Sequence, residues 1–158
     1  MTIPEGVTSI GDYAFYSCSG LTSVKIPESV TSIGWNPFAG CINLNSIRVA
    51  SGNPRFISVD DVLFSKDKTE LIAFPGAKTG DYSIPSGVTS IGHGAFWGCS
   101  GLTSVKIPES VTSIELLAFS DCTSLQHVYY SGTQEQWKNI SVGADNSALT
   151  DATIHFNS

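Results

Sequence analysis

One sixteen-residue phrase, CSGLTSVKIPESVTSI, occurs twice in this chain without a change, at residues 18–33 and 99–114. Shorter relatives of its second half, IPEGVTSIG from Ile3 and IPSGVTSIG from Ile84, fill further parts of the sequence. A phrase repeated this closely describes one structural unit made several times, and not one site made once. The sequence therefore constrains the architecture strongly and the chemistry weakly.

The repeat has a fixed period of 23 residues. This interval separates Cys18 from Cys41, Cys99 from Cys122, Phe15 from Phe38, Phe96 from Phe119 and Pro85 from Pro108. A period in the low twenties predicts the stacked repeats of a solenoid, in which each repeat contacts mainly its neighbours. Within one unit, the alternation of Leu21, Val24 and Ile26 predicts a strand with one buried face. The Ala-Phe pair that follows the glycine predicts a short helical turn.

The unit L-x-x-V-x-I-P-x-x-V-x-x-I-G-x-x-A-F-x-x-C resembles the leucine-rich repeat of the BspA-like class. The resemblance implies an α/β, β-rich leucine-rich-repeat solenoid: a curved, mostly parallel sheet, with short strands and helical turns on the opposite side. It also implies a bacterial surface or secreted protein that binds an extracellular protein or glycan, and therefore an extracellular or cell-surface location. Function cannot be taken from the fold alone, so these implications stand as expectations.

The expected domain organisation is a repeat array at residues 1–130, with an irregular insert at 50–83, followed by a C-terminal cap at 131–158. In the cap, Thr133 and Gln136 have the spacing of a capping box at the start of a short helix. Trp137, Ile140 and Phe156 are expected to form its apolar underside. Because Met1 falls in the middle of a repeat, we also expect the chain to be a fragment with an open N-terminal edge, which invites self-association.

The insert contains two apolar strands, Val62–Ser65 and Leu71–Phe74, around the polar link Lys66-Asp67-Lys68-Thr69. The favoured interpretation is two short repeats, in which the first strand joins the main sheet and 70–74 lies on the opposite side. The alternative is one long repeat that carries a β-hairpin, because a polar four-residue link suits a hairpin as well.

The four cysteines are expected to form a ladder of buried free thiols. Equivalent positions on neighbouring strands lie about 4.7–4.9 Å apart with side chains pointing the same way. A disulfide instead needs Cβ atoms that converge to about 3.8 Å. A disulfide and a metal site are the less favoured alternatives.

Composition excludes some classes of function. Eight basic against fourteen acidic residues give a net charge of −6, the reverse of the balance expected for a nucleic-acid-binding protein. No apolar run approaches the roughly 18–20 residues that span a bilayer, so membrane insertion is not expected. No signal peptide is recognisable in the chain.

The candidate binding surface is the outward face of the main sheet. Stacking should align Lys25 with Arg48, and Lys106 with Tyr129, which gives a small basic ladder on an acidic protein. The candidate binding residues are Ser23, Lys25, Ser46, Arg48, Ser104, Lys106, His127 and Tyr129. The alternative is that a sheet face needs polar residues and that lysine discourages edge pairing.

Two sets of aromatic residues have different expectations. The evenly spaced phenylalanines, Phe15, Phe38, Phe96 and Phe119, should form a core spine. Tyr13, Tyr16, Trp35 and Trp97 flank the Ala-Phe element. They are either exposed, where they would stack on sugars or anchor a protein partner, or partly buried between repeats, which is the favoured interpretation.

Catalysis has no support in the sequence. His93, His127 and His155 fall at unrelated positions of the repeat, and serines are abundant because the unit itself contains Thr-Ser twice. We find no metal-ligand spacing and no phosphate-binding loop, so no cofactor is expected. The expected function is a non-catalytic, adhesin-like interaction module, and the alternative is a structural spacer or self-associating repeat fragment.

Overall fold

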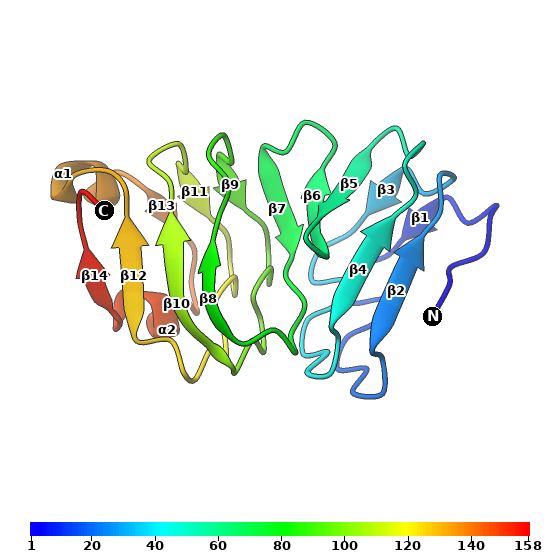
Figure 1. The fold of residues 1–158 in the computed structure, drawn as a ribbon, viewed down its shortest axis with the longest axis horizontal. Coiled ribbons are helices and arrows are strands. Elements are labelled where there is room, and N and C mark those ends of the chain that lie inside the picture. The colour runs from blue at the N-terminus through cyan, green and yellow to red at the C-terminus, as the bar shows by residue number, and fades with distance from the viewer.

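The computed structural model describes all 158 residues as a solenoid of about six repeats, as expected from the 23-residue period (Figure 1). Strands of successive repeats stack side by side along the long axis. The front sheet consists of β2 (Ser23–Ile26), β4 (Ser46–Val49), β8 (Gly80–Ser83), β10 (Leu102–Ile107), β12 (His127–Tyr130) and β14 (Thr153–His155). It has two parts, since β2 pairs with β4 and the other four strands pair in the order β14-β12-β10-β8.

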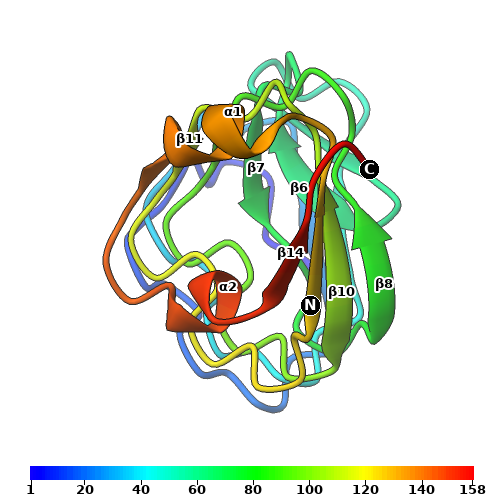
Figure 2. The same cartoon turned by 90° about the vertical axis from the view of Figure 1, so that its left-hand side faces the viewer.

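A second sheet lies across the core from the front sheet, as the end-on view shows (Figure 2). Its strands are β1 (Ser9–Ile10), β3 (Ser32–Ile33), β5 (Phe56–Val59), β6 (Val62–Ser65), β7 (Glu70–Ala73), β9 (Ser90–Ile91), β11 (Ser113–Ile114) and β13 (Ser141–Val142). It is also divided, into a β1-β3 pair and a six-stranded part in the order β13-β11-β9-β7-β6-β5. All pairings between regular repeats are parallel, for example Ser23↔Ser46 and Ser104↔His127.

Tight corners, not helices, carry the Ala-Phe elements. Hydrogen bonds three residues apart close them, such as Cys18 N–H to the Phe15 carbonyl at 3.2 Å. The corners stack through their backbones: Phe15 N–H donates to Pro37, and Phe96 N–H donates to Ala118. The corner that follows β3 meets the corner that follows β9 directly, since Gly40 N–H donates to the Trp97 carbonyl at 3.2 Å.

A glycine permits that direct contact. Gly98 has φ +81, and a Cβ added to it would lie 3.1 Å from the Gly40 Cα. An L-residue at this position would meet both the left-handed backbone and the neighbouring repeat.

The insert contradicts the favoured interpretation and agrees with the alternative, one long repeat that carries a β-hairpin. β5, β6 and β7 form an antiparallel meander, and β7 then pairs in parallel with β9 in the second sheet. Placing Val62–Ser65 in the front sheet was therefore wrong, whereas placing Glu70–Ala73 on the opposite side is confirmed. The hairpin of the alternative interpretation exists between β6 and β7, and it is part of the second sheet.

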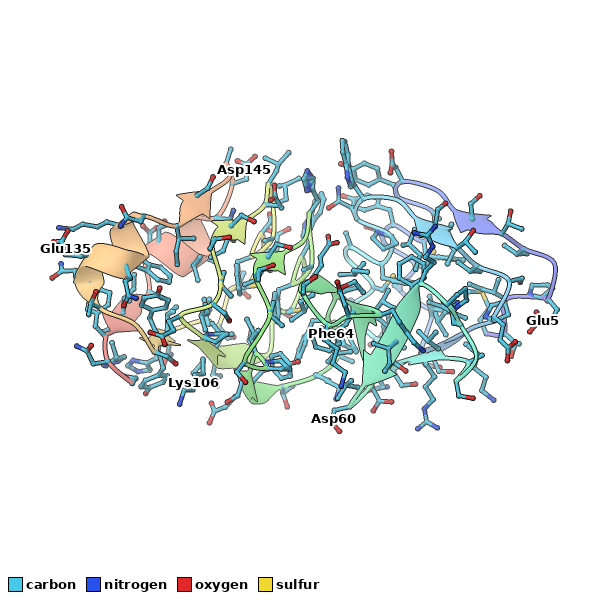
Figure 3. All side chains as sticks on the ribbon, turned by 90° about the horizontal axis from the view of Figure 1, so that it is seen from above. Glu5, Asp60, Phe64, Lys106, Glu135 and Asp145 are labelled. Carbon is cyan, nitrogen blue, oxygen red and sulfur yellow. The ribbon has the colours of Figure 1, made fainter.

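Strand β6 is a partition inside the solenoid. Val62, Leu63 and Phe64 are all completely buried. Leu63 belongs to a hydrophobic cluster of 12 residues in the N-terminal half, while Val62 and Phe64 belong to a cluster of 23 residues in the C-terminal half. A strand covered on both faces needs a continuous apolar run without polar alternation, and Val-Leu-Phe is such a run. Figure 3 places Phe64 within the body of the molecule.

The phenylalanine spine is confirmed, in two sections. Phe15 and Phe38 stack at 5.4 Å in the N-terminal half, and Phe96 and Phe119 stack at 4.7 Å in the C-terminal half. Phe74 of the insert extends the second section, 4.9 Å from Phe96. The spine is thus divided at the same level as the two sheets.

The C-terminal segment has the predicted elements. Thr133 caps helix α1 (Gln134–Lys138) in a capping box with Gln136, and Asn146 precedes helix α2 (Ser147–Thr150). Trp137, Ile140 and Phe156 pack on the last repeat. Both sheets continue into this segment through β13 and β14, and the boundary at residue 130 stays a prediction.

The cysteines are unpaired, and three of the four are buried, as the ladder interpretation predicts. The Cys41 thiol donates to the Phe15 carbonyl at 2.9 Å, and the Cys122 thiol to the Phe96 carbonyl at 3.1 Å. Burial raises the pKa of Cys122 to about 12. These thiols therefore stay protonated at neutral pH and act as small apolar groups.

Candidate functional site

The candidate binding residues lie where stacking predicts them, in columns on the outward face of the front sheet. Lys25 is in register with Arg48, and Lys106 with Tyr129, so both predicted alignments are confirmed. The residues on either side of Lys25, Val24 and Ile26, are buried, as are Val105 and Ile107 beside Lys106. In Figure 3, Lys106 and Asp60 project on one side of the molecule, opposite Asp145.

The front sheet is interrupted between β4 and β8, and the tip of the β5–β6 hairpin fills the interruption. Ile47 N–H donates to the Asp61 carbonyl at 3.0 Å, which fastens the hairpin tip to β4. On the other side, the Lys78 ammonium donates to the Asp60 carbonyl at 2.8 Å. The eight predicted residues therefore fall into two patches. The N-patch is Ser23, Lys25, Ser46 and Arg48, and the C-patch is Ser104, Lys106, His127 and Tyr129.

The hairpin tip partly neutralises the N-patch. The Asp61 carboxylate lies 3.4 Å from Arg48 Nε and 3.9 Å from Lys78 Nζ. Arg48 keeps 69% of its side chain exposed, and exposed ion pairs of this kind contribute less than about 1 kcal/mol. The N-patch thus has one cation outside any ion pair, Lys25, and one cation, Arg48, that shares the Asp61 carboxylate with Lys78.

The C-patch is an ordered cluster of rings beside a lysine. The His127 Nδ1 lies 3.0 Å from the His155 Nε2, so one imidazole donates to the other. The Tyr129 and His155 rings stack at 4.6 Å with an angle of 13° between their planes. Next to them, the Ser104 hydroxyl donates to the Asp81 carboxylate at 2.7 Å. This patch offers rigid rings, one cation and one carboxylate within a single face.

Sequence reasoning missed three members of this face: Asp61, Asp81 and His155. His127 and His155 were wrongly taken to occupy unrelated positions, because the cap was treated as separate from the array. The pairing of β12 with β14 places Tyr129 directly opposite His155. The alternation in Ala152–Phe156 was the available signal, since it predicts a further strand.

Three of the four aromatic residues of the corners contradict the favoured prediction of partial burial, and Trp97 agrees with it. Tyr13 and Tyr16 are each 46% exposed and Trp35 is 61% exposed, whereas Trp97 is half-buried. Trp97 lies 5.3 Å from Tyr16 and 6.4 Å from Tyr13 between ring centres. Trp35 stacks on His93 at 4.6 Å. The corners of three repeats therefore carry two groups of rings, Trp35 with His93 and Trp97 with Tyr13 and Tyr16.

Ionisable groups outside these surfaces do not converge. No three His, Cys, Asp or Glu side chains are grouped in a way that could hold a metal ion. Asp67 accepts hydrogen bonds from Ser65 and Thr69, and these bonds lower the pKa of its carboxyl. The helices are too short and too polar to cross a membrane.

Comparisons with known proteins agree with the repeat geometry. The family model "BspA type Leucine rich repeat region" matches residues 1–79 and 70–155, in six copies. No curated protein matches the chain.

Two solved structures share the arrangement of strands. A leucine-rich repeat protein from Eubacterium ventriosum is 33% identical over 82% of this chain, with a TM-score of 0.68. The pneumococcal vaccine antigen PcpA is 22% identical over 99% of this chain, with a TM-score of 0.66, and shows the fold alone. The chain spans 41% and 56% of the lengths of these two proteins.

Proposed function

Because the chain belongs to the BspA-type leucine-rich repeat family, we propose that it is a non-catalytic, adhesin-like module of a bacterial surface or secreted protein. It binds an extracellular protein through the front sheet. The observation that carries the proposal is the in-register placement of polar and aromatic side chains in columns over a fully buried core. Such a face offers a partner several side chains whose positions are fixed by the backbone.

The C-patch is the expected centre of contact. Tyrosine and histidine rings that are already stacked lose little conformational freedom on binding, and rigid aromatic groups dominate the energy of many interfaces. Lys106 and Lys25 add positive charge on the same face, which would steer an acidic partner toward it. Asp61 and Asp81 would disfavour partners that place acidic groups beside them.

The test is binding of the whole chain to a panel of immobilised extracellular-matrix proteins by surface plasmon resonance. Replacing Lys25, Arg48 and Lys106 together with Ser should weaken binding at least tenfold without lowering the melting temperature. Tyr129→Ala should have an effect of similar size. The matched control is Lys66→Ser, Lys68→Ser and Lys138→Ser, which removes the same charge from exposed residues outside the front sheet. Equal weakening by both triple variants, or binding that neither changes, would remove the front sheet from consideration.

A second candidate function is self-association through the outer side of the first repeat. Ile3, Val7, Ile10 and Phe15 help to line an open cavity of about 310 Å³ there. A second copy of the chain would bury this apolar surface. Light scattering over a hundredfold range of concentration tests it: a rising mass that Val7→Glu abolishes supports association, and a constant monomer mass counts against it.

A further inference from the structure

The second sheet is broken between β3 and the insert, and the break forms a cavity. Ile10 and Ile91 are the equivalents of Ile33 in other repeats, and their carbonyls accept a hydrogen bond from the next repeat. The Ile10 carbonyl accepts from Gly34 N–H, and the Ile91 carbonyl accepts from Glu115 N–H. β3 pairs only with β1, so the Ile33 carbonyl faces the break without a backbone donor. The cavity has a volume of about 200 Å³, and its lining includes Ile33, Trp35, Glu70 and His93.

The aromatic rings beside this cavity are held in place before any ligand arrives. Trp35 stacks on His93 across the break, with 22° between the ring planes. The Trp97 indole N–H donates to the Asp121 carboxylate at 3.1 Å, which fixes the ring against Tyr16. Tyr13 connects the two groups, because its backbone N–H donates to the Trp35 carbonyl at 2.9 Å. We call these five residues, Tyr13, Tyr16, Trp35, His93 and Trp97, the aromatic corner.

Carboxylates, which accept hydrogen bonds, lie around the aromatic corner and its cavity. Glu70 lines the cavity, Glu115 lies 3.9 Å from His93, and Asp121 holds Trp97. No lysine or arginine lines the cavity. Partial burial raises the pKa of the Glu70 carboxyl, and the Glu115 charge raises it further. A carboxyl that has lost part of its hydration gains from hydroxyl donors supplied by a ligand.

This combination matches the chemistry of a neutral saccharide. A sugar ring has an apolar C–H face, which packs on an exposed aromatic plane, and a rim of hydroxyl donors, which suits carboxylates and a free carbonyl. Sulfated or carboxylated sugars would meet uncompensated negative charge. A protein partner would be expected to bring a hydrophobic side chain and would leave the polar rim of the cavity unpaired.

We propose that the aromatic corner and the cavity between Trp35 and Glu70 form a binding site for a neutral glycan chain. One sugar ring packs against the exposed edge of Trp35 at the mouth of the cavity, because His93 covers the Trp35 face that points across the break, and its hydroxyls point toward Glu70 and the Ile33 carbonyl. A neighbouring ring of the same chain packs on Tyr13 and Tyr16. This site lies apart from the front sheet, and it does not depend on the function proposed for that sheet.

The experiment is isothermal titration calorimetry of the full chain with four neutral hexasaccharides: β-1,4-glucan, α-1,4-glucan, β-1,4-N-acetylglucosamine and α-mannan. A heparin hexasaccharide serves as the anionic probe. We expect saturable binding of at least one neutral probe, weakened at least tenfold by Trp35→Ala and about threefold by Tyr16→Ala. Trp35 is mostly exposed, so its removal should leave the melting temperature nearly unchanged. Ile42→Ala, at an exposed apolar residue outside the aromatic corner, is the control and should bind normally.

Several results would overturn the proposal. These are no heat with any neutral probe, unchanged affinity in Trp35→Ala, or tighter binding of heparin than of every neutral probe. The triple front-sheet variant of Lys25, Arg48 and Lys106 should bind the neutral probe as the unmodified chain does. Loss of glycan binding in that variant would show that the glycan binds at the front sheet, and it would also contradict a binding site at the aromatic corner. A failure of the front-sheet proposal alone leaves this result intact.

Discussion

The phrase CSGLTSVKIPESVTSI occupies two places in the molecule, and its identical side chains have different environments in each. In the copy at 99–114, Cys99, Leu102 and Ile114 are completely or almost completely buried. In the copy at 18–33, the equivalent Cys18, Leu21 and Ile33 are only half-buried. The strand is also longer in the second copy, six residues in β10 against four in β2.

Neighbouring repeats explain the difference. β10 lies between β8 and β12 and pairs with both. β2 pairs with β4 on one side and has a single bridge, from Thr2 to Lys25, on the other. Ile33 faces the break in the second sheet, whereas Ile114 pairs with β9 and β13 through its strand. Identical sequence therefore does not give identical protection: the adjoining repeats decide how much of each copy is hydrogen-bonded and buried.

The largest expected effect comes from opening the partition between the two hydrophobic clusters. Phe64→Ala removes a completely buried ring from β6 and should lower the free energy of unfolding by about 4 kcal/mol. Urea denaturation followed by circular dichroism measures it. Ile42→Ala, which removes an exposed side chain, should stay within about 0.5 kcal/mol of the unmodified chain. A similar small change for Phe64→Ala would show that β6 does not separate two cores.

The two equivalent leucines sharpen the comparison directly. Leu102→Ala should cost about 3 kcal/mol, because it leaves a cavity in the C-terminal cluster. Leu21→Ala should cost about 1 kcal/mol, because the side chain is half-exposed and water can fill the space. The same denaturation experiment compares them. Equal losses would mean that the sequence of the unit, and not its neighbours, sets its contribution.

The buried thiols give a smaller effect that depends on pH. A cysteine in the unfolded chain has a pKa of about 8.5, whereas burial raises the pKa of Cys122 in the folded chain to about 12. The protonated thiol makes its full contribution to the free energy of unfolding at pH values below the pKa that it has in the unfolded chain. This contribution is lost as the pH rises toward the folded pKa, by at most about 1.4 kcal/mol per pH unit and thiol.

Cys122→Ser tests this contribution, since the hydroxyl can keep the bond to the Phe96 carbonyl but does not ionise in this range. Between pH 9 and pH 11, in the presence of a reductant, the variant should lose stability less steeply than the unmodified chain. Parallel slopes would contradict the raised pKa.

Much of the fold could be predicted because the repeated letters fix the spacing. The period placed Phe96 over Phe119 and Lys25 beside Arg48, and the structure confirms both. The capping box at Thr133 was also predictable, since it depends on residues three positions apart. These features are either local or enforced by exact repetition.

The insert could not be placed in the same way, because it has no equivalent elsewhere in the chain. Its apolar run Val62–Phe64 does contain a signal, since three consecutive buried positions favour a strand covered on both faces. Contacts that follow from the insert were missed with it, including Asp61 beside Arg48 and the break that exposes Trp35. His155 was missed for a different reason: the alternation in Ala152–Phe156 predicts a strand, but this segment was assigned to a cap separate from the repeat array, so its pairing with β12 was not considered.

Hydrogen exchange in the two identical segments tests most directly the claim that neighbouring repeats decide protection. Their intrinsic exchange rates are equal, so any difference reports the environment alone; NMR with sequence-specific assignments is needed to tell the copies apart. We expect the amides of Ser104–Ile107 to exchange at least tenfold more slowly than those of Ser23–Ile26. Equal protection of the two segments, or greater protection of the first, would contradict the account.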